Sequence, residues 1–133
     1  MKKIVLLPFF FAITIIAGAQ ISLDVLSTEP DSLLQGIKVQ RIAGDKNSTS
    51  FVIWIKDAVK AHKHITHTEN IYVLEGEGEM KLKGKIIKIK PGDYVNIPEN
   101  TVHSVKVTST AVLKVLSIQS PEFLGEDRVF MEE

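Results

Sequence analysis

Residues 61–76 read AHKHITHTENIYVLEG, and the rest of the chain is interpreted from this stretch. Three of the four histidines of the protein fall within it. His62 and His64 are separated by one residue, so on an extended strand their side chains point to the same face. Glu69 follows after a short gap, and neutral imidazole and carboxylate are both good donors to divalent transition metals. The stretch therefore predicts part of a metal site.

The fourth histidine, His103, lies far downstream on a second strand-like segment. Val105 and Val107 share its face of that strand, and polar residues alternate on the other face. Apolar companions indicate that His103 points to the interior, where it is a candidate to complete the site. The first stretch is less informative, because strict alternation places Lys60 on the face of His62.

The length and composition restrict the class of protein. A chain of 133 residues is long enough for one domain with a core and too short for two ordinary domains. Lys and Arg total 16 and equal Asp and Glu at 16, so no net charge would attract nucleic acid or an anionic membrane. The chain has no cysteine, which excludes disulfides and thiolate metal sites. Any metal must be bound by His, Asp or Glu.

Residues 1–19 have the pattern of a secretion signal peptide. Two lysines follow the initial methionine, residues 4–16 are almost entirely apolar, and residues 17–19 are small. An uncleaved membrane anchor is the alternative, but the apolar run is shorter than the roughly 20 residues that span a bilayer, and it contains Pro8. We expect cleavage before Gln20 and an exported protein, periplasmic or secreted, that is free of the membrane.

Residues 20–133 are expected to form a single domain of β-strands. Short runs of β-branched, aromatic or alternating apolar and polar residues recur along it, separated by Gly, Pro and Asn. The expected strands are 33–42, 51–55, 71–74, 79–83, 86–90, 94–97, 103–107 and 111–118. Many short strands at regular spacing predict an all-β sandwich or barrel. No helix is expected after the signal.

With these residues placed, the chain resembles the cupin superfamily, specifically its small single-domain members. In the first cupin motif a glycine precedes a His-x-His, which is followed by a glutamate and a further glycine. His62, His64, Glu69 and Gly76 match the later positions in identity and spacing. Lys56 stands where the motif begins with a glycine.

The second cupin motif is also present, with two departures. Gly92, Pro98 and His103 match its first glycine, its proline and its histidine in spacing. Asn100 replaces its second glycine, and asparagine tolerates the left-handed backbone better than most residues do. Val107 replaces its final asparagine. Two motifs in order, with all ligand positions filled, are much more specific than a single His-x-His.

The resemblance implies a jelly-roll-like cupin β-barrel over about residues 36–120, within the single domain of residues 20–133. It also implies one divalent metal bound by four residues: His62, His64, Glu69 and His103. The alternative is a group of polar residues without a metal, but burying three imidazoles and a carboxylate without a shared partner is costly. Members of this family readily form dimers, so a homodimer is expected.

The resemblance does not determine a reaction, because this fold carries many functions. Three imidazoles and a carboxylate would leave two positions open on an octahedral ion, and they suit Zn, Mn, Fe, Ni or Cu. One interpretation is a small metalloenzyme of oxygenase, isomerase or lyase type that acts on a small organic substrate. The alternative is a non-catalytic module that binds a metal or a small ligand. Lys60, His67 and Tyr72 are candidates for a general base, and no catalytic residue is assigned.

Other residues have structural interpretations. His67 falls in the gap of the first motif, where a loop position or a place behind the ligands is favoured over a fifth ligand. Trp54 and Met80 are expected in the core. The lysines of residues 81–90 are expected on the solvated face of a hairpin. Residues 121–133 carry three large apolar side chains that could pack over the barrel, and no chemistry is assigned to them.

Overall fold

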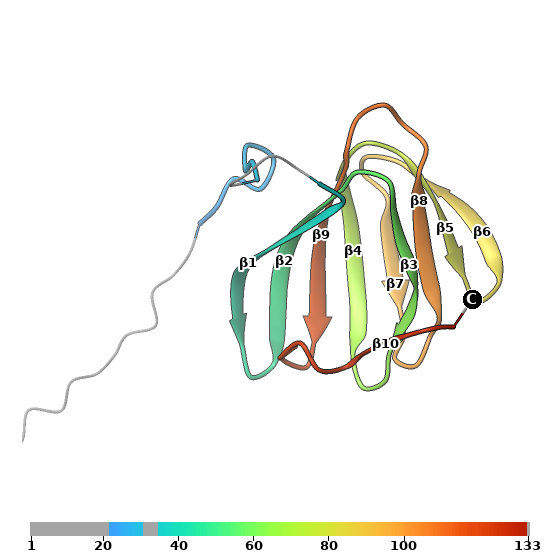
Figure 1. Cartoon of the computed structure of the whole chain (residues 1–133). Helices are drawn as coiled ribbons and strands as arrows, with labels where there is room; N and C mark the ends of the chain where they lie inside the picture. Colours follow the sequence, from blue (N-terminus) through green and yellow to red (C-terminus); the bar gives the residue numbers. More distant parts are fainter. Residues whose placement is uncertain (1–21, 31–34, 133) are drawn as a thin grey trace, which may run out of the picture.

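The structure is a computed structural model that describes residues 22–30 and 35–132, and its regular elements are β-strands (Figure 1). They are β1 Ile37–Asp45, β2 Ser48–Ile55, β3 Ala58–His64, β4 Thr68–Glu75, β5 Gly78–Leu82, β6 Lys85–Ile89, β7 Tyr94–Ile97, β8 His103–Val107, β9 Leu113–Ser120 and β10 Arg128–Phe130. Within the described residues, no helix is long and apolar enough to cross a membrane. The predicted signal, residues 1–19, lies outside them.

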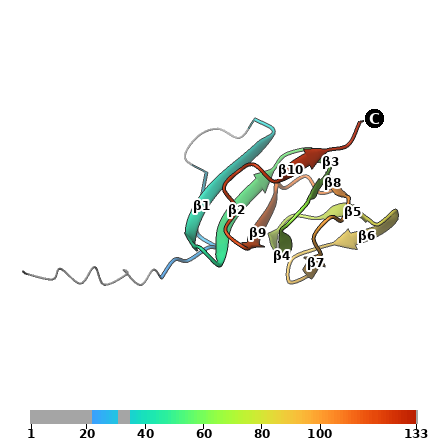
Figure 2. The same ribbon diagram turned by 90° about the horizontal axis from the view of Figure 1, so that it is seen from below.

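The strands form two antiparallel sheets that face each other (Figure 2). One sheet has the order β1-β2-β9-β4-β7 and the other the order β10-β3-β8-β5-β6. From β2 onward the chain changes sheet at each connection except the β5–β6 hairpin. Such crossing between two antiparallel sheets is typical of a jelly roll. The prediction of an all-β, jelly-roll-like fold is therefore confirmed.

The core lies between the two sheets and follows from alternation within each strand. In β2, Phe51, Ile53 and Ile55 belong to this core, and in β9, Leu113 and Val115. The opposite sheet contributes Met80, Ile89 and Val105. Each sheet has an apolar inner face that must be covered, so the two sheets bury these faces against each other.

Trp54 and Met80 are both buried as predicted, at 4% and 2% exposure, but in different places. Met80 belongs to the core between the sheets. Trp54 lies beneath the side chain of Lys114, whose Nζ is 5.8 Å from the ring centroid. The same Nζ donates to the carbonyl oxygens of Leu26 and Thr28 at 2.8 and 2.6 Å. The chain before β1 is thereby fixed to the outer face of β2 and β9.

A β-bulge in β3 determines which of its side chains face the interior. Val59 pairs with Val105 of β8 and His62 pairs with His103, so β3 has one extra residue between these pairs. As a result Val59 and His62 both line the interior cavity, whereas Lys60 is exposed. The expectation that Lys60 shares the face of His62 is wrong, because the bulge shifts the alternation.

Positive φ angles occur at three positions of the motifs, which are Gly76, Gly92 and Asn100. Gly76 has φ +74°, and a Cβ there would collide with the carbonyl oxygen of Val112. Asn100 has φ 55°, and its N–H donates to the carbonyl oxygen of His64 at 2.5 Å. Lys56 does not have a positive φ, so the glycine of the first motif is not needed there. The Asn100 turn ties the approach to β8 to the end of β3 and so brings the two motifs together.

Candidate metal centre

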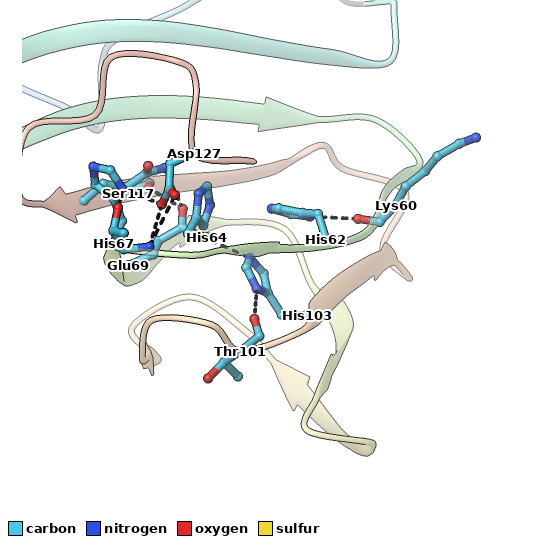
Figure 3. A network of polar contacts seen from close by, with 11 residues as sticks. Lys60, His62, His64, His67, Glu69, Thr101, His103, Ser117 and Asp127 are labelled. Atoms are coloured by element: carbon cyan, nitrogen blue, oxygen red, sulfur yellow. Dashed lines mark hydrogen bonds and ion pairs between the residues drawn. The ribbon is translucent and has the colours of Figure 1, made fainter. Parts of the chain in front are cut away.

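The four residues predicted to bind a metal converge at one end of the interior (Figure 3). β3 carries His62 and His64, β4 carries Glu69, and β8 carries His103. One ligand atom from each residue lies within 4.8 Å of those of the other three. All four side chains are buried, at 5% exposure or less. We refer to these residues as the four-residue cluster.

Backbone carbonyls fix the tautomer of two of the histidines. Nδ1 of His62 lies 2.8 Å from the carbonyl oxygen of Lys60, and Nδ1 of His103 lies 2.9 Å from that of Thr101. A carbonyl oxygen can only accept, so each Nδ1 carries the proton and donates it. The Nε2 lone pair of each ring is left to face the cluster, as it does in histidines that bind a metal.

Glu69 is held by one carboxylate oxygen and presents the other. Its Oε1 accepts hydrogen bonds from Ser117 Oγ at 2.5 Å and from Gln119 Nε2 at 3.3 Å. Its Oε2 lies 3.5 Å from His64 Nε2 and 3.3 Å from His103 Nε2. Burial alone would raise the pKa of Glu69, but contacts with His103 and His64 and the hydrogen bond from Ser117 lower this pKa well below its usual range. The carboxylate is therefore ionised.

The protonation of His62 and the contacts of His64 test whether a cation fits this site. Burial lowers the pKa of His62 to about 4, so this ring is neutral at neutral pH and can bind a metal. Both ring nitrogens of His64 are buried without a hydrogen-bond partner among the described residues. Unpaired buried polar atoms are costly and need an explanation. A divalent cation bound by His64 together with the other three ligand atoms would supply a partner for one of its two ring nitrogens, so the residues present fit a metal.

His67 is buried but lies outside the four-residue cluster. Its Nδ1 is 2.5 Å from Asp127 Oδ2, and its Nε2 is 3.0 Å from the carbonyl oxygen of Glu122. Burial lowers the pKa of His67, but the Glu122 carbonyl and the Asp127 carboxylate outweigh that effect and raise it. Both ring nitrogens are thus engaged by the C-terminal part of the chain, which makes His67 an anchor for that part.

The C-terminal segment, residues 121–132, covers the cluster. β10 pairs with the free edge of β3, and Phe130 lies opposite His62 in this pairing. The Phe123 ring packs edge-on against His64, with centroids 5.4 Å apart, and the Phe130 ring is 5.8 Å from His62. Sequence reasoning assigned no chemistry to this segment, because it contains no motif.

The support for Glu69 was also missed, although a signal for it exists. In β9 the residues Leu113, Val115, Ser117 and Gln119 alternate on one face, and all four are buried. Two polar residues that continue a buried apolar face need a polar partner inside. That pattern could have identified Ser117 and Gln119 as partners of a buried charged group.

An interior cavity of about 70 Å³ adjoins the cluster. Isoleucine, valine, leucine and methionine form most of its wall. The polar residues of the wall are His62, Glu69, His103, Ser104 and Arg128. None of the candidate general bases suggested by the sequence, which are Lys60, His67 and Tyr72, lines this cavity.

Comparisons with known proteins agree with this fold. The family described as the cupin domain matches residues 51–119. An uncharacterized protein of Aquifex aeolicus is 33% identical over 110 residues, which cover 83% of this chain and 90% of that protein. Quercetin 2,3-dioxygenase of Bacillus subtilis is 39% identical over 90 residues, but these cover 62% of this chain and 27% of that enzyme.

A solved structure shows the same architecture. The uncharacterized conserved protein with a double-stranded β-helix domain from Klebsiella pneumoniae superposes with a TM-score of 0.70. The match covers 84% of this chain and 97% of that one at 17% identity, so it speaks for the fold alone. Together with the matched family, the two facing sheets and the two motifs, this likeness leads to one conclusion. The chain belongs to the cupin domain family.

Proposed function

We propose that this protein binds one divalent transition metal through His62, His64, Glu69 and His103, and acts on a small organic substrate as a metalloenzyme. One observation carries the proposal. The second donor atoms of three of these residues are already engaged, by the carbonyls of Lys60 and Thr101 and by Ser117, so that their remaining donor atoms face one point. Such support behind the ligands is what metal sites require.

A bound metal would supply Lewis-acid or redox chemistry, and Zn, Mn, Fe, Ni and Cu all suit this donor set. The protein would contribute a dry, apolar pocket. Ile55, Ile71 and Val105 belong to a wall that excludes water and strengthens electrostatic contacts with the substrate. The relative from Bacillus subtilis is named a dioxygenase, which is consistent with oxygenase chemistry and leaves isomerase and lyase chemistry as alternatives.

Elemental analysis of residues 20–133 tests the proposal. We expect about one of these metals per chain in the wild type and none in a His64→Ala variant, since that variant loses a ligand. A His67→Gln variant is the matched control, because His67 is buried but lies outside the four-residue cluster, and it should keep the metal. Absence of metal from the wild type, even after reloading with each of the five ions, would refute the proposal.

The alternative is a cupin that binds a metal or a small ligand without catalysis. The cavity wall favours it in one respect, because no acid or base lines the cavity beyond members of the four-residue cluster and Arg128 among the described residues. Oxygen consumption and product formation by the metal-loaded protein separate the two functions. Ligand binding without turnover of a small organic substrate would favour the binding module.

We also infer that the protein is exported and that it forms a homodimer. Export is supported by the pattern of residues 1–19, and mass spectrometry of the protein from its native cells should find a chain that starts at Gln20. An intact chain in the cytoplasm would contradict export.

The dimer is supported by Tyr72 and Tyr94, which are 43% and 63% exposed on paired strands. Analytical ultracentrifugation should find twice the mass of the chain, and the mass of one chain would contradict it.

A further inference from the structure

We infer that the ligand of the interior cavity is a small organic anion, a carboxylate with a compact apolar body, and that Arg128 binds its anionic group. This inference rests on the proposed function for the location of the site. It adds the chemical class of the ligand and a residue that determines specificity. Arg128 comes from the C-terminal segment and belongs to neither cupin motif.

Arg128 lies where the interior cavity, the four-residue cluster and the C-terminal segment meet. It is the first residue of β10 and pairs with His64 of β3. It lines the interior cavity together with His62, Glu69 and His103. It also lines a second cavity, of about 360 Å³, beneath the C-terminal segment. Its Cζ is 5.8 Å from the centroid of the Phe123 ring, which supports the guanidinium from one side.

The guanidinium has no anionic partner within the described residues. No carboxylate of residues 22–30 or 35–132 forms an ion pair with it, and its Nε is buried without a hydrogen-bond partner. Two carboxylates, one of the four-residue cluster and one of the C-terminal segment, are engaged elsewhere. Glu69 contacts Ser117 and the cluster histidines, and Asp127 contacts His67 and the N–H of Thr66. A partly buried charge is costly unless it is paired, so an anion bound in the cavity would stabilise Arg128.

The charge of the site favours an anion as well. Three neutral imidazoles and one carboxylate around a divalent ion leave a net positive charge, to which Arg128 adds another. The rest of the wall is largely apolar, and a low dielectric surrounding strengthens the attraction between this charge and an anion. A neutral ligand of the same shape would gain none of this attraction.

The size and chemistry of the cavity restrict the ligand further. A volume of about 70 Å³ is small for a ligand pocket, so the cavity favours a compact body over an extended ring system. Ile55, Val59 and Ile71 offer this body an apolar surface. The planar fork of a guanidinium matches the two oxygens of a carboxylate. A short branched carboxylate meets all three conditions.

Isobutyrate and isobutyramide test the inference, because they share a shape and differ in charge. Binding of each is followed by NMR of the isoleucine, leucine and valine methyl groups, in the metal-free and in the zinc-loaded protein. We expect the wild type to bind isobutyrate at least about tenfold more tightly than isobutyramide. A charge-assisted hydrogen bond contributes a difference in affinity of this size. An Arg128→Gln variant should lose this preference, and Arg128→Lys should keep part of it.

The control is Arg41→Gln, which removes the same charge from an exposed arginine paired with Glu122 and should leave the preference unchanged. Equal binding of the two probes by the wild type would overturn the inference. Retention of the preference in a folded Arg128→Gln variant would overturn it too, because the carboxylate would then be bound by the metal alone. If Arg128→Gln does not fold, Arg128→Lys replaces it in the test. This variant lacks the planar fork of the guanidinium, so an undiminished preference for isobutyrate in it would overturn the inference.

Metal content, measured in every sample, separates this inference from the proposed function. A metal-loaded wild type without a preference for isobutyrate refutes the role of Arg128 and leaves the metal site intact. A wild type that holds no metal but prefers isobutyrate in an Arg128-dependent way refutes the metalloenzyme and leaves the anion site intact.

Discussion

The four-residue cluster and the C-terminal segment, residues 121–132, meet at one cavity but are held in different ways. The cluster side chains come from β3, β4 and β8, inside the two sheets, and are buried at 5% exposure or less. The C-terminal segment depends on the short strand β10 at an edge and on a few contacts such as that between Asp127 and His67. Regions with few buried contacts open at a lower free energy than core strands do. We therefore expect the protein to combine a rigid site with a cover, the C-terminal segment, that detaches more easily.

Removal of the cluster carboxylate should have the largest effect. In Glu69→Gln the anionic ligand is lost, and we expect the affinity for the metal to fall by more than about a hundredfold, since even changes behind a ligand cost about 10- to 100-fold. Competition with a chromophoric chelator measures this affinity. Glu75→Gln is the control, because Glu75 lies on the same strand and is exposed. A loss below about threefold would mean that the cluster is not the metal site.

Removal of a support behind the cluster should have a smaller effect. Ser117→Ala deletes the hydroxyl that holds Glu69 Oε1, so the carboxylate loses its fixed orientation, and we expect the affinity for the metal to fall by about tenfold. Ser120→Ala, on the same strand, should change it little. An unchanged affinity in Ser117→Ala would show that Gln119 alone orients the carboxylate.

The residues of the four-residue cluster were predictable because metal chemistry restricts residue types and spacing. His62, His64, Glu69 and His103 could each be named from the sequence, and the structure brings them together. The all-β, jelly-roll-like fold followed from alternation and from the two motifs, whereas the order of the strands in the two sheets was not predicted. A cover, by contrast, needs only generic apolar and charged residues, so Phe123 and Arg128 carried no recognisable pattern.

The bulge in β3 shows a second limit of the sequence. Whether Lys60 or Val59 faces the cavity depends on one extra residue relative to β8, a property of the pairing of two strands and not of either one. Local alternation cannot reveal it. His62 was nevertheless placed correctly, because its prediction rested on ligand chemistry rather than on the periodicity of that strand.

Weakening of the cover should lower stability without affecting the metal. Phe123 is half-buried and its ring contacts the rings of Phe51, His64 and His67. We expect Phe123→Ala to lower the free energy of unfolding by about 2 kcal/mol, less than for a fully buried phenylalanine. Urea denaturation measures this change. The control Leu124→Ala, at a position 76% exposed, should stay within about 0.5 kcal/mol of the wild type.

The smallest effect is expected where the cover alone opens. Asp127→Asn weakens the contact with His67, and we expect it to lower the free energy of local opening of the C-terminal segment by about 1 kcal/mol, with little change in global unfolding. The N–H of Met131 reports this opening, because it donates to the carbonyl oxygen of Ala61 at 2.9 Å and is freed when β10 leaves β3. Its hydrogen exchange should become about fivefold faster, whereas amides of β9 should exchange as before.

Glu126→Gln, at the exposed neighbouring position, should change neither rate. The amide of Met131 could instead exchange as slowly as the amides of β9 in the wild type, with Asp127→Asn changing both exchange rates equally. In that case the C-terminal segment unfolds only together with the sheets. The contrast between a rigid site and a detachable cover would then be wrong.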